Sequence, residues 1–202
     1  MSKLLAKTFS FIFHPLLLPA AGILVLFNSG SMLEYLPFEA KKIIFFIVLI
    51  STSVLPLTFV PFFIFQKIIK NIYMENNKER LIPFFITSVL YFFAYYLLVR
   101  LGAPASVNVF ILASACAVFM LFLLSIKWKI SAHMVGIGGL TGALIAISFR
   151  LNINLQELII AAIFVSGILG YSRLTLKMHK SFEVYTGWLT GLMVTAIVIL
   201  VY

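Results

Sequence analysis

Seven long apolar runs constrain what this chain can fold into more than any other feature. A transmembrane α-helix needs about 20 consecutive, mostly apolar residues. Runs close to that length occupy residues 8–27, 43–65, 82–99, 106–126, 132–149, 155–171 and 184–202. They are continuous rather than alternating, which favours helices over a transmembrane β-barrel. The sequence therefore predicts an all-α, polytopic transmembrane helical bundle with about seven spans (six are possible), forming a single membrane domain over residues 1–202.

The charge content excludes a water-soluble domain of ordinary composition. Of 202 residues, 63% are hydrophobic and only 10% are charged, whereas a soluble domain is roughly a quarter charged. A net charge of +9 would suggest nucleic-acid binding in a soluble protein. Here the basic residues stand between the apolar runs or at their ends, so we expect no nucleic-acid partner. The first run continues to about Phe27, longer than a usual signal-peptide core, and we interpret it as a retained span.

Basic residues are distributed unevenly between the two sides of the predicted bundle. With seven spans, eleven of the 15 Lys and Arg residues fall on the N-terminal side, and four fall on the other: Lys41, Lys42, Arg100 and Arg150. Cytoplasmic loops carry an excess of Lys and Arg, so this bias predicts a cytoplasmic N-terminus. We expect a protein of a cell inner membrane, surrounded by membrane lipids.

Glycines and prolines predict the local geometry of several spans. The fifth run contains small residues that let helices approach closely, namely Gly136, Gly138, Gly139 and Gly142. The first two runs contain prolines that are expected to kink them, namely Pro15, Pro19, Pro56 and Pro61.

Three polar clusters remain once the apolar runs are set aside: Lys67–Arg80, Lys127–His133 and Ser172–Glu183. The number of spans between them is even, so all three are expected on one side of the membrane. Phosphoryl transfer depends mostly on positioning and on stabilising negative charge. Histidines gathered with several Arg and Lys side chains at one membrane surface therefore predict a phosphate site.

The cations of these clusters are candidate phosphate ligands. Arg173 presents a planar guanidinium that can hold two phosphate oxygens, and Lys78 and Arg80 add charge from the first cluster. His133 begins the fifth run, and the free N–H groups of a helix N-terminus favour an anion. Ser131 is equally well explained as the N-cap of that helix or as a phosphate contact.

The histidines of the second and third clusters suit covalent and acid chemistry. A neutral imidazole can attack phosphorus, and a second imidazole can protonate the leaving oxygen. Glu183 follows His179 by four residues, so on a helix its carboxylate can fix the His179 tautomer. His14 lies in the first run, and we interpret it as an interfacial histidine without a catalytic role.

Two of the clusters resemble a known family. The third cluster resembles the SRxxxxxHxxxD signature of the type 2 phosphatidic acid phosphatases. In it, Ser172-Arg173 is followed after five residues by His179, and His179 is followed after three residues by Glu183. That superfamily also contains vanadium haloperoxidases and bacterial acid phosphatases. Ser131-Ala132-His133 is similar to its PSGH signature, and the motifs follow in the family's order within residues 67–190. The chain departs from the family pattern at five positions, which are Tyr73 for Lys, Leu81 for Pro, Ile130 for Pro, Ala132 for Gly and Glu183 for Asp.

The resemblance implies roles for particular residues. It implies that His179 is the nucleophile, that His133 is the general acid and that Glu183 supports His179. It also implies a set of phosphate-binding residues: Arg173, Ser131, Ser172, Lys78 and Arg80.

The leading hypothesis is a membrane phosphatase that hydrolyses a lipid phosphate or diphosphate through a phospho-histidine, with the lipid tail remaining in the bilayer. These residues require no metal or other cofactor for that chemistry. One alternative is a catalytically degraded relative that binds anionic lipid head groups or acts as a membrane partner protein, which the departures from the motifs motivate. Another is a small redox protein that binds haem through histidines, motivated only by the three His residues.

Overall fold

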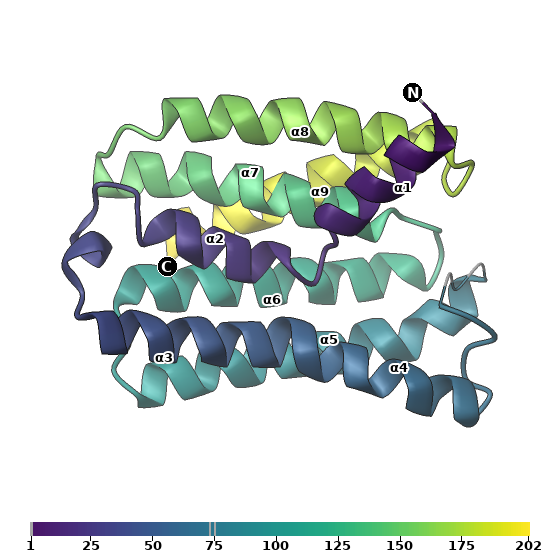
Figure 1. Cartoon of the computed structure of the whole chain (residues 1–202), viewed down its shortest axis with the longest axis horizontal. Helices are drawn as coiled ribbons and strands as arrows, with labels where there is room; N and C mark the ends of the chain where they lie inside the picture. The colour runs from purple at the N-terminus through teal and green to yellow at the C-terminus, as the bar shows by residue number, and fades with distance from the viewer. Residues whose placement is uncertain (1, 73, 75) are drawn as a thin grey trace.

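The chain folds as an all-helical bundle in the part that the computed structural model describes, residues 2–72, 74 and 76–202. The helices lie side by side with their connections at the two ends of the bundle (Figure 1). No strand occurs within the described ranges, and the prediction of an all-α bundle is confirmed. In chain order the elements are α1 (Lys3–Ile12), α2 (Leu18–Leu26), η1 (Met32–Tyr35), α3 (Phe38–Leu49), η2 (Ile50–Val54), α4 (Leu55–Phe65), α5 (Asn77–Arg100), α6 (Ala105–Ser125), α7 (Ala132–Leu151), α8 (Gln156–Thr175) and α9 (Ser181–Val201).

Six helices of the described chain are long and apolar enough to cross a membrane, and we treat the protein as an integral membrane protein. The first is continuous over Phe38–Phe65 and joins α3, η2 and α4; the others are α5, α6, α7, α8 and α9. These six correspond to the second to seventh apolar runs. The run at 155–171, the shortest predicted, belongs to a full helix of 20 residues, α8.

The first apolar run differs from the expected single span, because it forms the two short helices α1 and α2 with a break at residues 13–17. Pro15 disfavours helical backbone at His14, and Pro19 has no N–H to continue a helical ladder. Figure 1 shows α1 entering from the end of the bundle where the N-terminus lies and α2 running on towards the other end. The predicted kinks at these prolines are therefore a complete interruption.

The second span contains a π-helical turn, η2, just before Pro56. A π-turn disturbs the regular helical ladder and often marks a functional site. The carbonyl of Thr52 in this turn accepts a hydrogen bond from the Tyr91 hydroxyl at 3.2 Å. The Ser53 hydroxyl donates to the carbonyl of Leu16 at 2.7 Å. The turn thus joins α5 on one side to the break in the first run on the other.

Helices α7 and α9 pack in close backbone contact, as the glycines of the fifth run predicted. A Cβ atom at Gly138 would overlap the carbonyl oxygen of Trp188, and one at Gly191 would overlap that of Val135. The contact is therefore possible only with hydrogen at these positions. It holds together the two helices that follow the second and third polar clusters.

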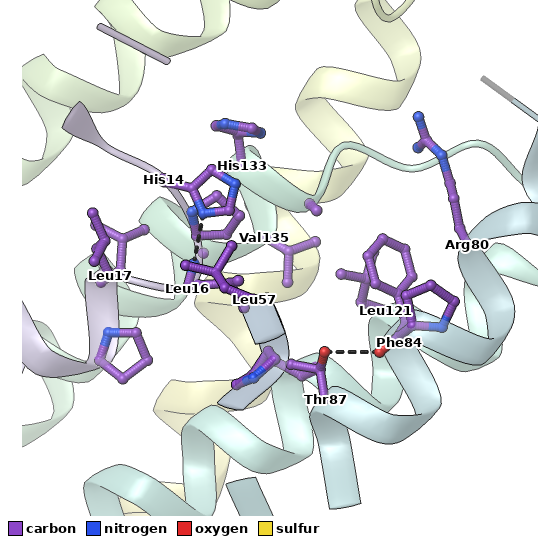
Figure 2. A pocket seen from close by; sticks show the side chains of 18 of the residues that line it. His14, Leu16, Leu17, Leu57, Arg80, Phe84, Thr87, Leu121, His133 and Val135 are labelled. Carbon is purple, nitrogen blue, oxygen red and sulfur yellow. Dashed lines mark hydrogen bonds between the residues drawn. The ribbon is translucent and has the colours of Figure 1, made fainter. Parts of the chain in front are cut away.

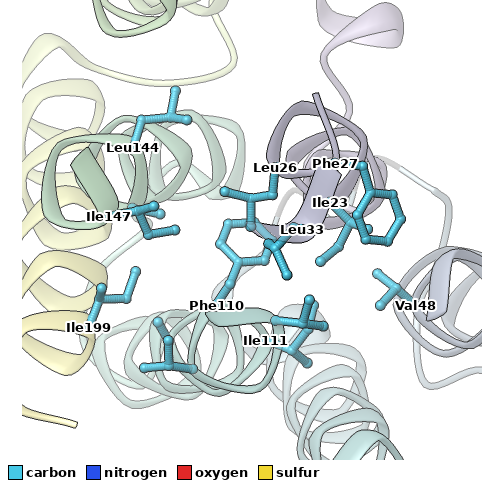
Figure 3. Close-up of a cluster of buried hydrophobic side chains, with 14 of the residues drawn as sticks. Ile23, Leu26, Phe27, Leu33, Val48, Phe110, Ile111, Leu144, Ile147 and Ile199 are labelled. Carbon is cyan, nitrogen blue, oxygen red and sulfur yellow. The ribbon is translucent and has the colours of Figure 1, made fainter. Parts of the chain in front are cut away.

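The largest apolar core lies towards the end of the bundle opposite the polar clusters. Figure 3 shows Ile23 and Leu26 of α2 meeting Phe110 of α6 and Ile147 of α7. In a bilayer such side chains stabilise the bundle through close van der Waals packing rather than through removal from water. Buried side chains fill this end of the bundle, whereas the end with the polar clusters contains a cavity.

Candidate functional site

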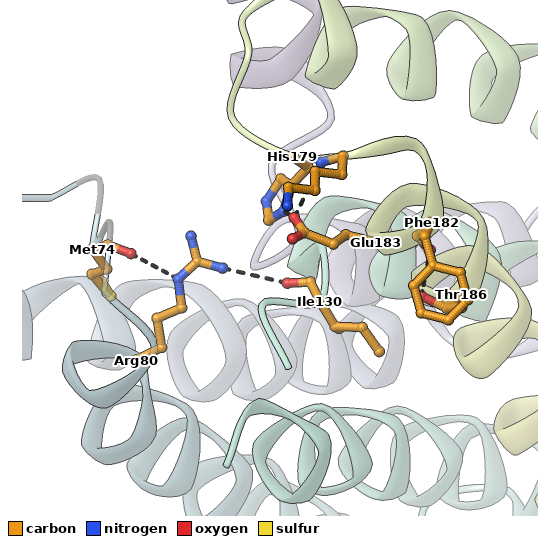
Figure 4. A network of polar contacts seen from close by, with 8 residues as sticks. Met74, Arg80, Ile130, His179, Phe182, Glu183 and Thr186 are labelled. Carbon is orange, nitrogen blue, oxygen red and sulfur yellow. Dashed lines mark hydrogen bonds and ion pairs between the residues drawn. The ribbon is translucent and has the colours of Figure 1, made fainter. Parts of the chain in front are cut away.

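The three polar clusters meet at one end of the bundle, where hydrogen bonds join them directly (Figure 4). The Arg80 Nη1 group donates to the carbonyl of Ile130 at 3.3 Å, which links the first cluster to the second. The Ser131 N–H donates to the carbonyl of Glu183 at 3.2 Å, which links the second to the third. The expectation that span parity gathers these clusters is confirmed in this geometry. Tyr73, which replaces the Lys of the family pattern, lies outside the described residues.

His179 is held by the carboxylate of Glu183. Its Nδ1 lies 2.9 Å from Glu183 Oε2, and its side chain is only 2% exposed. The same carboxylate oxygen accepts the Lys180 N–H at 3.2 Å, which caps the start of α9. A carboxylate only accepts hydrogen bonds, so Nδ1 carries the hydrogen and Nε2 keeps its lone pair, which no hydrogen bond among the described residues occupies.

The environment of His179 keeps its ring neutral. Burial lowers the pKa of His179 to about 4, and the positive charges of Arg80 and Arg173 act in the same direction. The hydrogen bond and negative charge of Glu183 oppose these effects without cancelling them. A neutral imidazole with an unbonded Nε2 is the form that can attack phosphorus.

Arg80 and Arg173 are buried cations, and the negative charges of Glu183 and Glu79 act on Arg80 without forming an ion pair among the described residues. They are 6% and 8% exposed, and within the described residues neither makes an ion pair. Arg80 donates from Nε to the carbonyl of Met74 at 2.7 Å, in addition to its bond to Ile130. The Nε of Arg173 has no hydrogen-bond partner among the described residues. A buried charge is costly unless it is paired, so this pair is a strong attractor for an anion.

His133 lies in the first turn of α7, with its Nε2 3.0 Å from the carbonyl of Ser10 in α1. A carbonyl accepts, so Nε2 carries hydrogen and Nδ1 is left for proton exchange. Ser131 occupies the N-cap position of α7, yet its hydroxyl makes no capping bond. That hydroxyl is buried without a partner in the described chain.

A cavity of about 1210 Å³ opens beside these groups and extends between the helices towards the middle of the bundle. Its polar end is lined by Arg80, Arg173, His133 and His179. Its deeper walls are mostly apolar and include Phe84, Leu121 and Val135 (Figure 2), with a few hydroxyl groups such as those of Thr87, Tyr91 and Ser114. Ligand sites of this kind combine apolar walls with a few polar groups that fix orientation.

Three of the five predicted phosphate ligands, Lys78, Ser172 and Ser131, do not line this cavity. Lys78 is exposed and does not line it. The Ser172 hydroxyl donates to the carbonyl of Ile168 on its own helix at 2.7 Å, so it is used within α8. Ser131 and Glu183 also lie outside the lining, although both contact groups that form it. Of the two cations proposed as phosphate ligands in the first cluster, only Arg80 therefore lines the cavity.

No protein-family model, curated protein or solved structure matches this chain. The site is thus interpreted from its own geometry. No group of three or more His, Cys, Asp and Glu residues in the described ranges is arranged to hold a metal ion. The chemistry that these side chains can perform is anion binding by two guanidiniums, nucleophilic attack by one imidazole and proton transfer by another.

The sequence analysis interpreted His14 as an interfacial histidine and did not place it at this site. Its ring lines the same cavity and lies edge-on to that of His133, with 5.4 Å between ring centroids. Lys7 of α1 also lines the cavity. The signal for His14 was the sequence His-Pro inside an apolar run, which predicts a break in the helix at an ionisable residue.

Proposed function

We propose that this chain is a phosphatase of a cell inner membrane that hydrolyses a lipid phosphate or diphosphate at its cytoplasmic end. The observation that carries this proposal is the pair Arg80 and Arg173, buried without an ion pair in the described chain at the head of a mostly apolar cavity. A phosphate supplies the negative charge that this pair requires. An acyl or prenyl chain matches the apolar walls behind it.

The cavity changes where the lipid tail is expected to lie. Tyr91, Phe110 and Ser114 line its deep end, far along α5 and α6 from the polar clusters. A tail that follows its head group into this cavity leaves the bilayer for the interior of the bundle. The substrate class is therefore a lipid with at least one chain that can enter between helices.

The proposed reaction proceeds in two steps. The Nε2 lone pair of His179 attacks phosphorus, an N–P bond forms and the P–O bond to the lipid breaks. The protonated ring of His133 gives its Nδ1 proton to the leaving oxygen, which yields a lipid alcohol or, from a diphosphate, a lipid monophosphate. Water then attacks the phospho-histidine, His133 takes one of its protons, the N–P bond breaks with its electron pair returning to His179 Nε2, and inorganic phosphate leaves. Arg80 and Arg173 balance the phosphoryl charge throughout.

The resemblance of the second and third clusters to the type 2 phosphatidic acid phosphatases supports the same assignment of roles to His179 and His133. The excess of basic residues at the N-terminal side supports the cytoplasmic placement.

Trapping the covalent intermediate tests the proposal. Protein mixed with a lipid phosphate that carries radiolabelled phosphorus is quenched in alkali, which preserves phospho-histidine, and the label is mapped. We expect label on His179 and none in His179→Ala. The matched control is Lys177→Asn, which removes an exposed charge from the same loop at a left-handed residue (φ 54°) that Asn tolerates. Label retained in His179→Ala, or lost in the control, contradicts the proposed nucleophile.

A further inference from the structure

The break between α1 and α2 is anchored by other helices. The Ser53 hydroxyl of η2 bonds the Leu16 carbonyl at 2.7 Å. On α7, a Cβ at Gly136 would lie 2.8 Å from Leu18 Cδ1 and 3.2 Å from Pro15 Cβ, so the break packs directly against this glycine. The bond between His133 and the Ser10 carbonyl adds a third attachment. The position of the break is therefore set by the spans that carry the site.

His14 is placed in this break with a defined tautomer. Its Nδ1 accepts the Leu16 N–H at 3.4 Å, so the hydrogen of the neutral ring is on Nε2. Within the described residues, Nε2 has no hydrogen-bond partner. Figure 2 shows the His14 ring beside His133, with one nitrogen bonded to Leu16 and the other at the opposite side of the ring.

The charge of the surrounding groups favours a neutral donor at this position. His14 interacts electrostatically with Arg173, and both line the cavity that also contains Arg80. The cavity already receives positive charge from Arg80, Arg173, Lys7 and, in the proposed reaction, the protonated His133, so a further cation at His14 would add repulsion. A neutral imidazole N–H adds a hydrogen bond to an anion without adding charge, and a bond to a charged acceptor is stronger than one between neutral groups.

We propose that His14 is a third histidine of the phosphate site, whose Nε2–H donates a hydrogen bond to a phosphate oxygen of the bound lipid phosphate. This inference rests on the proposed function and extends it. The family resemblance lies within residues 67–190, so it assigns no role to the N-terminal segment. The broken first run is then a binding element that completes the site from α1 and α2.

Two substitutions separate the donor from the shape of the ring. His14→Phe keeps a ring of similar size and removes the N–H. His14→Gln places an amide N–H near the position of Nε2. The probe is inorganic phosphate, measured as a competitive inhibitor of phosphate release and, independently, by the shift that it causes in the thermal unfolding midpoint of the purified protein. We expect His14→Phe to bind phosphate about 10- to 100-fold more weakly, as loss of a hydrogen bond to a charged group implies.

In the same measurement, His14→Gln is expected to bind within about 3-fold of the wild type, since a neutral donor remains. Gly136→Ala is a second variant that changes no polar group. Its methyl group displaces Pro15 and Leu18, and we expect weaker phosphate binding because the break moves. Wild-type affinity in a folded His14→Phe protein overturns the inference, as does equal weakening in the Phe and Gln variants. Where His14→Phe does not fold, wild-type affinity in Gly136→Ala overturns it.

The two readouts distinguish this inference from the proposed function. A wild-type protein that releases no phosphate from any lipid, yet binds inorganic phosphate in a His14-dependent manner, contradicts the phosphatase and supports the third histidine. A protein that releases phosphate equally well with His14→Phe, and shows the same inhibition by inorganic phosphate, supports the phosphatase and contradicts the third histidine.

Discussion

The Nδ1 atom of His179 lies 2.9 Å from the Oε2 atom of Glu183, one helical turn further along the chain. The contact orients a buried imidazole so that its other nitrogen is free, and it caps the first turn of α9 at the same time. The same carboxylate therefore serves the proposed catalysis and the stability of α9. A substitution that tests one of these roles has to preserve the other.

Glu183→Gln makes that separation, because the amide oxygen still accepts hydrogen bonds from His179 and Lys180 while the negative charge is lost. We expect kcat for phosphate release to fall about 10- to 100-fold, since a charged acceptor is replaced by a neutral one. The thermal unfolding midpoint should change little. Wild-type kcat in this variant would show that the carboxylate acts only as a cap.

The pKa of His179 predicts how stability depends on pH. The unfolded histidine has a pKa of 6.5, and burial lowers the folded value to about 4. Between these values the unfolded chain binds a proton that the folded chain does not. His179 thus contributes stability that is complete above about pH 6.5 and lost as the pH falls towards about 4.

The measurement for this prediction is the unfolding midpoint from about pH 7 to about pH 4, compared with His179→Asn. Asn does not titrate and keeps an N–H for Glu183. We expect the wild-type midpoint to fall more steeply on acidification than that of the variant. Parallel curves for the two proteins would contradict the lowered pKa.

Arg173→Met tests whether the buried guanidinium is kept for function at the expense of stability. Removing an unpaired buried charge should raise the free energy of unfolding by about 1 kcal/mol or more. Phosphate release should be lost. Inorganic phosphate should raise the unfolding midpoint of the wild type and not that of the variant.

The control for this charge removal is Arg150→Met at the opposite end of the bundle, where Arg150 donates to the carbonyl of Ile199 at 2.6 Å. That variant should retain phosphate release and lose a little stability. A destabilised Arg173→Met protein with full activity would mean that Arg173 has a structural role.

Ser114→Phe tests whether the lipid tail enters the bundle. Ser114 lines the deep end of the cavity, where a phenyl ring would occupy the path of a chain. We expect kcat/KM for a long-chain lipid phosphate to fall about 10-fold, the lower end of what a small steric change in an apolar pocket costs. A short, water-soluble phosphate ester should be hydrolysed at the wild-type rate.

Leu123→Phe is the matched control on the same helix, because Leu123 is 40% exposed and does not line the cavity. It should not change the dependence on chain length. Equal loss for long and short substrates in Ser114→Phe would place the tail outside the bundle.

Much of the fold follows from local patterns that the sequence displays directly. The apolar runs are continuous and about as long as a bilayer is thick, so six spans and the meeting of three polar clusters were predictable. The contact of His179 with Glu183 was expected from a helical spacing of four residues, but α9 begins at Ser181, so the contact joins a loop histidine to the first turn of that helix.

Features that depend on packing between distant segments were not predictable in the same way. Nothing in the sequence near Lys78 and Arg80 indicates which one turns inward, because that choice depends on the Ile130 carbonyl, which reaches the site from another cluster. Ser172 has a local acceptor in Ile168 that a motif does not reveal. The placement of His14 depends on where a broken helix packs, and its anchors at Ser53 and Gly136 lie on other spans.

The most direct test of the phosphatase itself is a phosphate-release screen with purified protein and vesicles that contain phosphatidic acid, phosphatidylglycerol phosphate or a polyprenyl diphosphate. His179→Ala provides the inactive control. The proposed function predicts release of inorganic phosphate from at least one of these lipids by the wild type and from none by the variant. Binding of these lipids with no release by the wild type, or equal release by the variant, would contradict it.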